Sequence, residues 1–192
     1  ENLKYLNRKF EFFPKVIKFN DAYLIIQYLE NDKKKPNNTN LDFLDAVIKN
    51  FALLVMEPAR KELTGNTQLE ILFAKWTQWI SIDQRAGGCL LIAASTELDD
   101  RPGELREYLA KQQIEWLDCI RRMAQKAVSQ DSLKIGLDTR QFAFEFHSIG
   151  LSLNFSLRLL NDQKAPERAY TAFSKLMQNA KSQPTTITRY NN

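Results

Sequence analysis

Apolar residues recur every three or four positions from Leu41 onward, which is the spacing of one face of an α-helix. This pattern predicts a helix from Leu41 that Pro58 bends or ends, because proline has no backbone N–H to donate. A second helix follows Asn66, and its inner stripe contains two tryptophans, Trp76 and Trp79. Asn40 is expected to cap the first helix. The chain is therefore predicted to be mostly helical.

Residues 87–109 combine a short helix of small residues with a break and the start of a long helix. The short helix is expected from Cys89 to about Glu97, and the long one continues to about Val128. Asp99 or Asp100 is expected to cap the long helix, with Pro102 in its first turn. This pair of carboxylates is therefore interpreted as a cap and not as acid–base machinery.

The predicted helix after the capping residue Asp138 carries two apolar faces. Its two apolar sets differ by two residues, or about 200° around a helix. They are Phe142, Phe146, Ile149, Leu153, Leu157 and Leu160, and then Phe144, Leu151, Phe155 and Leu159. One set can pack on the chain's own core, and we expect a second copy of the chain to cover the other. A helix buried wholly within one chain is the alternative.

Pro166 opens the last amphipathic helix, which is expected to pair with the preceding one in the dimer. The dimer interface predicted from these two helices comprises Phe144, Leu151, Phe155, Leu159, Tyr170, Phe173 and Met177.

Composition supports the helical prediction, since the 192 residues include only six glycines and six prolines. Cys89 and Cys119 have no metal-ligand spacing and are interpreted as small buried hydrophobes. Because these two cysteines form no disulfide scaffold, a reduced, cytoplasmic protein is predicted. No apolar run approaches the roughly 20 residues needed to span a bilayer, so no membrane contact is expected. Residues 1–40 carry eight Lys and Arg against five acids, a weak indication of an anionic partner.

The order of segments from Leu41 to Met177 resembles the sensing domain of the tetracycline-repressor (TetR) family of transcriptional regulators. The segments that carry the resemblance are GGCLLIAASTELDDRPGELREYL, WLDCIRRMAQKAV, RQFAFEFHSIGLSLNFSLRLLND and APERAYTAFSKLM. The resemblance implies an all-α homodimer with a small N-terminal helix-turn-helix and a larger domain that binds a small effector. It also implies that the last two helices form the dimer interface, in agreement with the two-faced pattern.

The N-terminal segment departs from the family pattern. Where the family has a glycine turn and an aromatic recognition helix, this sequence has ENDKKKPNNT, which contains neither glycine nor an aromatic residue. We therefore expect an atypical or degenerate helix-turn-helix DNA-binding domain over residues 1–40, an effector-binding and dimerisation domain over 41–181, and a frayed tail over 182–192. Lys33, Lys34 and Lys35 are the candidates for phosphate contacts, with a solvated basic loop as the alternative.

The resemblance places the effector pocket among the helices of the larger domain. Large aromatic side chains with a few hydroxyls suit a mostly apolar ligand. The predicted walls are Phe51, Val55, Trp76, Trp79, Ile92, Thr96, Trp116, Ile120 and Phe146. For each residue taken singly, core packing is the simpler interpretation.

Catalytic chemistry finds no support in the sequence. His147 is the sole histidine, and beside Glu145 alone it is interpreted as a structural or interface residue and not as a base or metal ligand. No phosphate loop, nucleophile elbow, metal motif or cofactor motif is recognisable.

The main hypothesis is a dimeric transcriptional regulator, expected to be a repressor, that binds operator DNA unless a mostly apolar effector intervenes. The alternative is a dimeric small-molecule-binding or protein-interaction module without DNA recognition.

Overall fold

The structure, a computed structural model, describes residues 38–82 and 89–181. Its elements are α3 (Asn38–Phe51), the π-helical segment η1 (Ala52–Met56), α4 (Glu57–Arg60), α5 (Gly65–Ile82), α6 (Leu90–Leu98), α7 (Glu104–Ser129), α8 (Thr139–Arg158) and α9 (Ala165–Ala180). The described part contains helices and one isolated bridge, between Leu133 and Lys181. The predicted helical nature is thus confirmed for this part, whereas residues 1–37 with Lys33, Lys34 and Lys35, and the tail 182–192, lie outside it.

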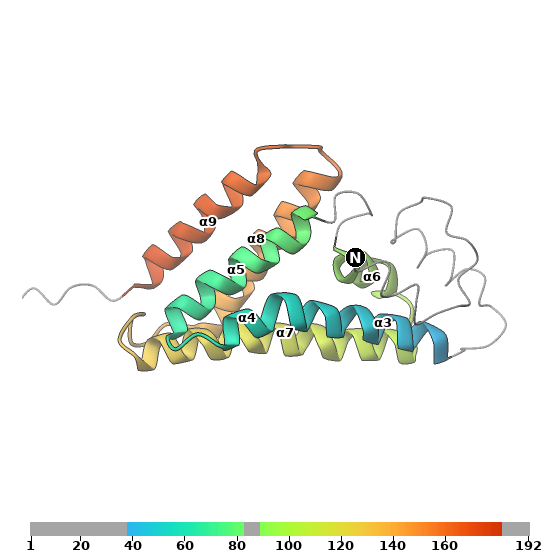
Figure 1. The fold of residues 1–192 in the computed structure, drawn as a ribbon, viewed down its shortest axis with the longest axis horizontal. Helices are drawn as coiled ribbons and strands as arrows, with labels where there is room; N and C mark the ends of the chain where they lie inside the picture. The colour runs from blue at the N-terminus through green and yellow to red at the C-terminus, as the bar shows by residue number, and fades with distance from the viewer. Residues whose placement is uncertain (1–37, 83–88, 182–192) are drawn as a thin grey trace, which may run out of the picture.

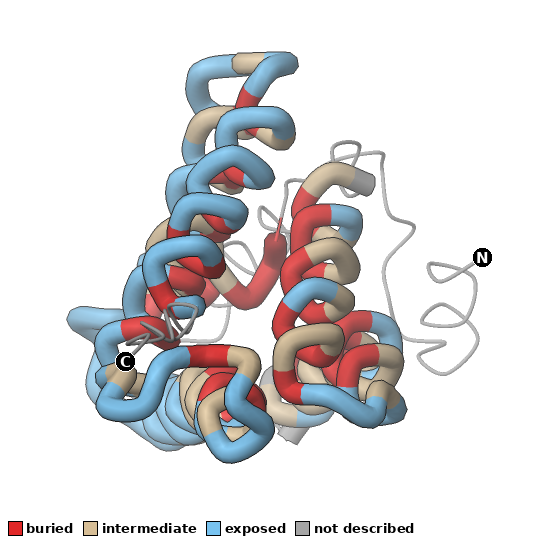
Figure 2. The backbone as a smooth tube through the Cα atoms, turned by 90° about the vertical axis from the view of Figure 1, so that its left-hand side faces the viewer, coloured by how far each residue is buried: buried red, intermediate tan, exposed pale blue. Residues whose placement is uncertain are grey.

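Helix α7 runs along one edge of the domain, and α3, η1 and α4 form a nearly continuous rod above it (Figure 1). Helices α5, α8 and α9 rise at an angle from this base, with α5 and α8 packed on α7 and α9 packed on α8. Figure 2 shows buried and exposed stretches alternating along the helices, so each helix buries one side. The long helix expected to end near Val128 ends at Ser129 and serves as the scaffold.

Pro58 widens the first helix locally but does not end it there. Its missing N–H cannot bond the carbonyl of Leu54, and the backbone widens into η1 just before it, then continues as α4 to Arg60. The rod already begins at Asn38, so the prediction that Asn40 caps it is wrong: local cap preference cannot fix a helix start to within a turn.

The two predicted aspartate caps have different outcomes. Asp138 precedes α8 and accepts hydrogen bonds from the backbone N–H groups of Arg140 and Gln141, at 2.9 and 3.0 Å, as predicted. The cap predicted at Asp99 or Asp100 is wrong, because Pro102 and Gly103 separate both residues from the start of α7 at Glu104. The side chain of Asp99 accepts the N–H of Asp100 instead, at 2.8 Å.

Two glycines let helices approach more closely than any larger residue permits. A Cβ on Gly65 at the start of α5 would lie 2.2 Å from the backbone nitrogen of Ala127 in α7. A Cβ on Gly150 in α8 would lie 2.1 Å from the indole ring of Trp76 in α5. Both contacts bring α5 into the centre of the domain, where Leu69, Leu72 and Phe73 are fully buried.

Candidate functional site

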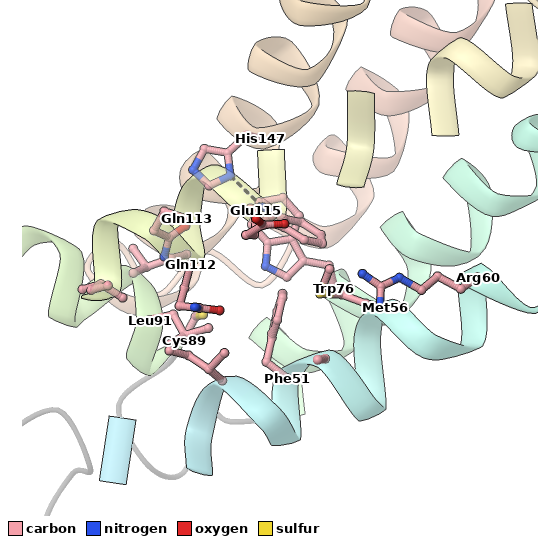
Figure 3. A pocket seen from close by; sticks show the side chains of 15 residues that line it. Phe51, Met56, Arg60, Trp76, Cys89, Leu91, Gln112, Gln113, Glu115 and His147 are labelled. Carbon is pink, nitrogen blue, oxygen red and sulfur yellow. Dashed lines mark hydrogen bonds between the residues drawn. The ribbon is translucent and has the colours of Figure 1, made fainter. Parts of the chain in front are cut away.

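A cavity of about 230 Å³ lies where the α3–α4 rod, α5, α6, α7 and α8 meet. Aromatic and aliphatic side chains form most of its wall, and five polar or charged side chains complete it (Figure 3). The lining residues are Ile48, Phe51, Ala52, Met56, Arg60, Trp76, Cys89, Leu91, Ile92, Leu109, Gln112, Gln113, Glu115, Trp116 and His147. An apolar hollow with a few polar groups is the usual form of a small-molecule site.

The aromatic part of the wall is a single connected cluster. Trp116 of α7 makes edge contacts with Phe51 of α3 and with Trp76 of α5, each with ring centroids 5.1 Å apart. Phe146 of α8 stacks behind Trp76 at 6.1 Å and is itself fully buried. Because the rings come from four helices, the cluster joins these helices by direct contact.

His147 of α8 is held on two sides within this cluster. Its ring stacks on Trp76, with centroids 5.4 Å apart and planes 12° apart, and its Nδ1 accepts a hydrogen bond of 3.0 Å from Trp116 Nε1 (Figure 3). Burial lowers the pKa of His147 below its usual 6.5, so the ring is neutral at pH 7. The histidine is therefore a fixed, uncharged polar group on the cavity wall.

The charged residues of the lining lie toward its edge. Arg60 donates to Glu57 one turn earlier in the rod, at 2.8 Å, and both side chains are more than two-fifths exposed. Glu115 is 57% exposed and lies 4.0 Å from Arg122. Solvent screens these pairs, so they contribute little net charge to the interior of the cavity.

A hydrogen bond ties the rod to α7 beside the cavity. The phenol of Tyr108 in α7 donates to Asp45 Oδ1 in α3 at 2.7 Å, and Lys49 pairs with the other carboxylate oxygen at 2.6 Å. Desolvation, followed by the contact with Asp45, raises the pKa of Tyr108 to about 12. The phenol thus stays protonated and keeps donating, which holds α3 over the cavity.

Only some of the residues predicted to form the cavity wall line the cavity in the structure. Phe51, Trp76, Ile92 and Trp116 line the cavity. Val55, Ile120 and Phe146 are fully buried but belong to the core behind it. Trp79 packs edge-on against Phe51 outside the lining, and Thr96 is exposed, with its hydroxyl bonded to the carbonyl of Ile92.

The polar part of the wall was not predicted. Gln112, Gln113, Glu115 and His147 are polar positions next to apolar ones on amphipathic helices, a pattern that also occurs on solvated surfaces. His147 was assigned a structural or interface role, and its bond to Trp116 is structural, yet the residue also faces the cavity. One feature of the sequence could have indicated that His147 lies inside: it directly follows Phe146 on a helix that is apolar on both faces.

The predicted division of α8 into two faces is confirmed. Phe142, Phe146, Leu153 and Leu157 are buried, while Phe144, Leu151, Phe155 and Leu159 are exposed by 66%, 39%, 51% and 70%. Leu160 departs from the pattern at 60% exposed, since it lies beyond the helix end at Arg158. We call Phe144, Leu151, Phe155, Leu159 and the 43% exposed Tyr170 of α9 the apolar face.

Two of the predicted interface residues are not part of the apolar face. Phe173 stacks on Phe73 with centroids 4.2 Å apart, and it and Met177 are only 6% and 5% exposed. Both lie on the inner side of α9, where its helical period turns them toward α5 and α8. They fill the core of their own chain and offer a partner almost no surface.

Several site types are absent from the described ranges, 38–82 and 89–181. They contain no group of three or more His, Cys, Asp or Glu arranged to hold a metal ion, and no helix long and apolar enough to cross a membrane.

Cys89 and Cys119 are buried, as predicted, and burial raises the pKa of the Cys119 thiol.

The neutral state of His147 predicts a specific pH dependence of stability. Below pH 6.5 the unfolded chain binds a proton that the folded chain does not, until the lowered folded pKa is reached. The free energy of unfolding should therefore fall as the pH decreases through this window, by up to about 1.4 kcal/mol per pH unit. Urea unfolding at pH 7.5, 6.5 and 5.5 measures the slope.

The control for this prediction is His147→Gln, which keeps an acceptor for Trp116 but does not titrate. His147 is the only histidine of the chain, so the variant should lose most of the slope between pH 5.5 and 6.5. Equal slopes in the two proteins would contradict the assignment of a neutral, buried imidazole.

The described residues thus form an all-helical domain with an aromatic cavity and an uncovered apolar face on its last two helices. Residues 65–173, more than half of the chain, match the family described as tetracyclin repressor-like, C-terminal domain. The chain belongs to this family and is a TetR-family transcriptional regulator, a class of proteins that are not enzymes.

Solved structures agree with this assignment at the level of the fold. A TetR transcriptional regulator from Chloroflexus aurantiacus J-10-fl has 18% sequence identity and a TM-score of 0.61, over 73% of this chain and 73% of that chain. A TetR-family transcriptional regulator from Cytophaga hutchinsonii has 14% identity and a TM-score of 0.61, over 75% of this chain and 70% of that one. Among curated proteins, none matches the sequence significantly.

Proposed function

We propose that this protein is a cytoplasmic, homodimeric transcriptional repressor whose binding to operator DNA is modulated by a small, mostly apolar effector in the cavity. The observation that carries the proposal is the cavity itself, because it is bounded by both the α3–α4 rod and α8. The rod leads toward the N-terminal segment, and α8 carries the apolar face. A ligand in the cavity would contact both the rod, which follows the N-terminal segment, and α8, which carries the apolar face.

The dimer in this proposal forms through the apolar face. Three large apolar side chains of α8, Leu159 at its C-cap and Tyr170 of α9 are exposed by 39% to 70%, and a cluster of exposed large apolar residues is typical of a protein interface. Exposed apolar residues on two adjacent helices suit a symmetric contact in which four helices pack together. Phe144, Leu151, Phe155, Leu159 and Tyr170 are the proposed interface residues.

The mechanism is a population shift. A dimer presents two N-terminal domains whose separation has to match successive turns of DNA, about 34 Å apart. An effector that binds one arrangement of the α3–α4 rod more tightly lowers DNA affinity only by that difference in affinity. Lys33, Lys34 and Lys35 would contribute phosphate contacts, and residues 1–40 would form the atypical reader.

An electrophoretic mobility shift with DNA from upstream of the protein's own gene tests the proposal. The expected result is a retarded complex whose affinity falls steeply as the salt concentration rises, since phosphate contacts release counterions. A protein that is folded and dimeric yet shifts no fragment of that DNA would contradict operator binding. That outcome would favour the alternative, a dimeric ligand-binding or protein-interaction module.

A further inference from the structure

The bond between Trp116 and His147 fixes which nitrogen of the histidine carries the proton. Tryptophan Nε1 is a donor only, so the His147 Nδ1 that it contacts at 3.0 Å has to be an unprotonated acceptor. In a neutral imidazole the other nitrogen, Nε2, then bears the hydrogen. A 180° turn of the ring about Cβ–Cγ would place Cδ2 where Nδ1 now accepts and would lose this bond, so the bond itself favours the observed orientation.

The remaining donor, His147 Nε2–H, stands at the cavity. His147 belongs to the lining, and Figure 3 shows its ring beside the cavity with one nitrogen bonded and the other on the side of Gln113. Within residues 38–82 and 89–181 no hydrogen-bond acceptor is found for Nε2. A donor of fixed direction in an aromatic cavity favours a ligand that supplies an acceptor, because a ligand that excludes water from this donor without pairing it leaves a desolvated polar group.

The lining residues that the structure describes offer no comparable partner for a charged ligand. The one cation among them, Arg60, is already paired with Glu57, and Glu115 is more than half exposed at the edge. An ion placed among Phe51, Trp76 and Trp116 would lose its hydration without gaining a buried counter-charge. The walls therefore select against formal charge.

We propose that the cavity selects an uncharged, largely apolar molecule with an oxygen acceptor that receives the Nε2–H of His147, and that Trp116 is the positioning residue that fixes this donor. The inference rests on the proposed function in one respect, since it takes the cavity to be the ligand site. It goes further by assigning the recognition to His147 and by defining the ligand class.

The first experiment needs no ligand. Because the chain has a single histidine, ¹⁵N-labelled histidine gives one pair of ring nitrogen signals in the full-length protein. At pH 7.5 the two-bond correlation pattern should show hydrogen on Nε2, and Trp116→Phe should yield a mixture of tautomers. A predominant Nδ1–H form in the unaltered protein would overturn the proposal, since the donor would then not face the cavity.

The second experiment uses three probes of nearly the same shape: indane, 1-indanone and 1-aminoindane. Tryptophan fluorescence and the His147 ¹⁵N signals report binding to the full-length protein. We expect 1-indanone to bind about tenfold more tightly than indane, because its carbonyl pairs the donor, and 1-aminoindane to bind most weakly. The tenfold preference should vanish in His147→Phe and shrink in Trp116→Phe.

The possible outcomes test the acceptor proposal and the proposed effector site separately. Equal affinity of the unaltered protein for indane and 1-indanone overturns the acceptor proposal but leaves the cavity as a ligand site. Tighter binding of 1-aminoindane overturns the selection against charge. Failure of all three probes to bind at their solubility limits overturns the inference and the proposed effector site together. The comparison of probes on the unaltered protein remains decisive even if a variant fails to fold.

Discussion

Gly150→Ala should destabilise the protein by about 2 kcal/mol, although alanine is the better helix former. The added Cβ would lie 2.1 Å from two carbons of the Trp76 ring, which is packed against other rings. It is 2% exposed, stacks on Phe146 and His147, and meets Trp116 edge-on. Relief of the clash therefore displaces the stacked rings and deforms the cavity.

A double-mutant cycle tests this explanation. Trp76→Phe removes the outer ring that the new Cβ would touch, so Gly150→Ala should cost at least about 1 kcal/mol less in that background. Urea unfolding of the four proteins gives the coupling energy. Equal costs of Gly150→Ala in both backgrounds would show that the ring contact is not what requires glycine.

Gly65→Ala should have the larger effect, a loss of about 3 kcal/mol. Here the new Cβ would meet backbone atoms of α7, at 2.2 Å from Ala127 N and 2.6 Å from Met123 O. Backbone inside a packed helix yields far less than a side chain, so the start of α5 would have to move away from α7. The fully buried Leu69, Leu72 and Phe73 follow on the same helix and would lose contacts with it.

Thermal unfolding measures this effect at roughly 2–4 °C per kcal/mol for a chain of this size. Asn66→Ala is the matched control: it lies one residue along, and it loses only an exposed 2.9 Å bond to Glu70, so its melting temperature should change little. A Gly65→Ala variant as stable as Asn66→Ala would mean that α5 and α7 are farther apart than the structure places them.

Helical periodicity predicted which faces of the chain are buried, and for α8 this was sufficient. The 200° offset between the set of Phe142 and the set of Phe144 separated inner from outer residues correctly as far as the helix extends, and failed at Leu160 beyond its end. The Asp138 cap was equally local, because the side chain bonds backbone groups only two and three residues away. These features depend on neighbours along the chain, which the sequence displays directly.

The cavity could be predicted only in part, for a geometric reason. Periodicity indicates that Val55, Ile120 and Phe146 are inside, but not whether a void or another side chain lies beyond them. Whether a cavity remains between the helices depends on the angles and distances at which they cross. Those are fixed by contacts such as that of Gly150 with Trp76. The role of His147 likewise depends on Trp116, thirty-one residues earlier on another helix.

The most direct test of the account is sedimentation velocity on the full-length chain at micromolar concentration, compared with Phe155→Glu. We predict a dimer, with twice the 22.3 kDa of one chain, for the unaltered protein and a monomer for Phe155→Glu. Phe155 is 51% exposed, so the charge should spare the core, and Gln125→Glu on the exposed side of α7 controls for the added charge. A single 22.3 kDa species for the unaltered protein, or an unchanged dimer for Phe155→Glu, would contradict the claim that a second copy covers the apolar face.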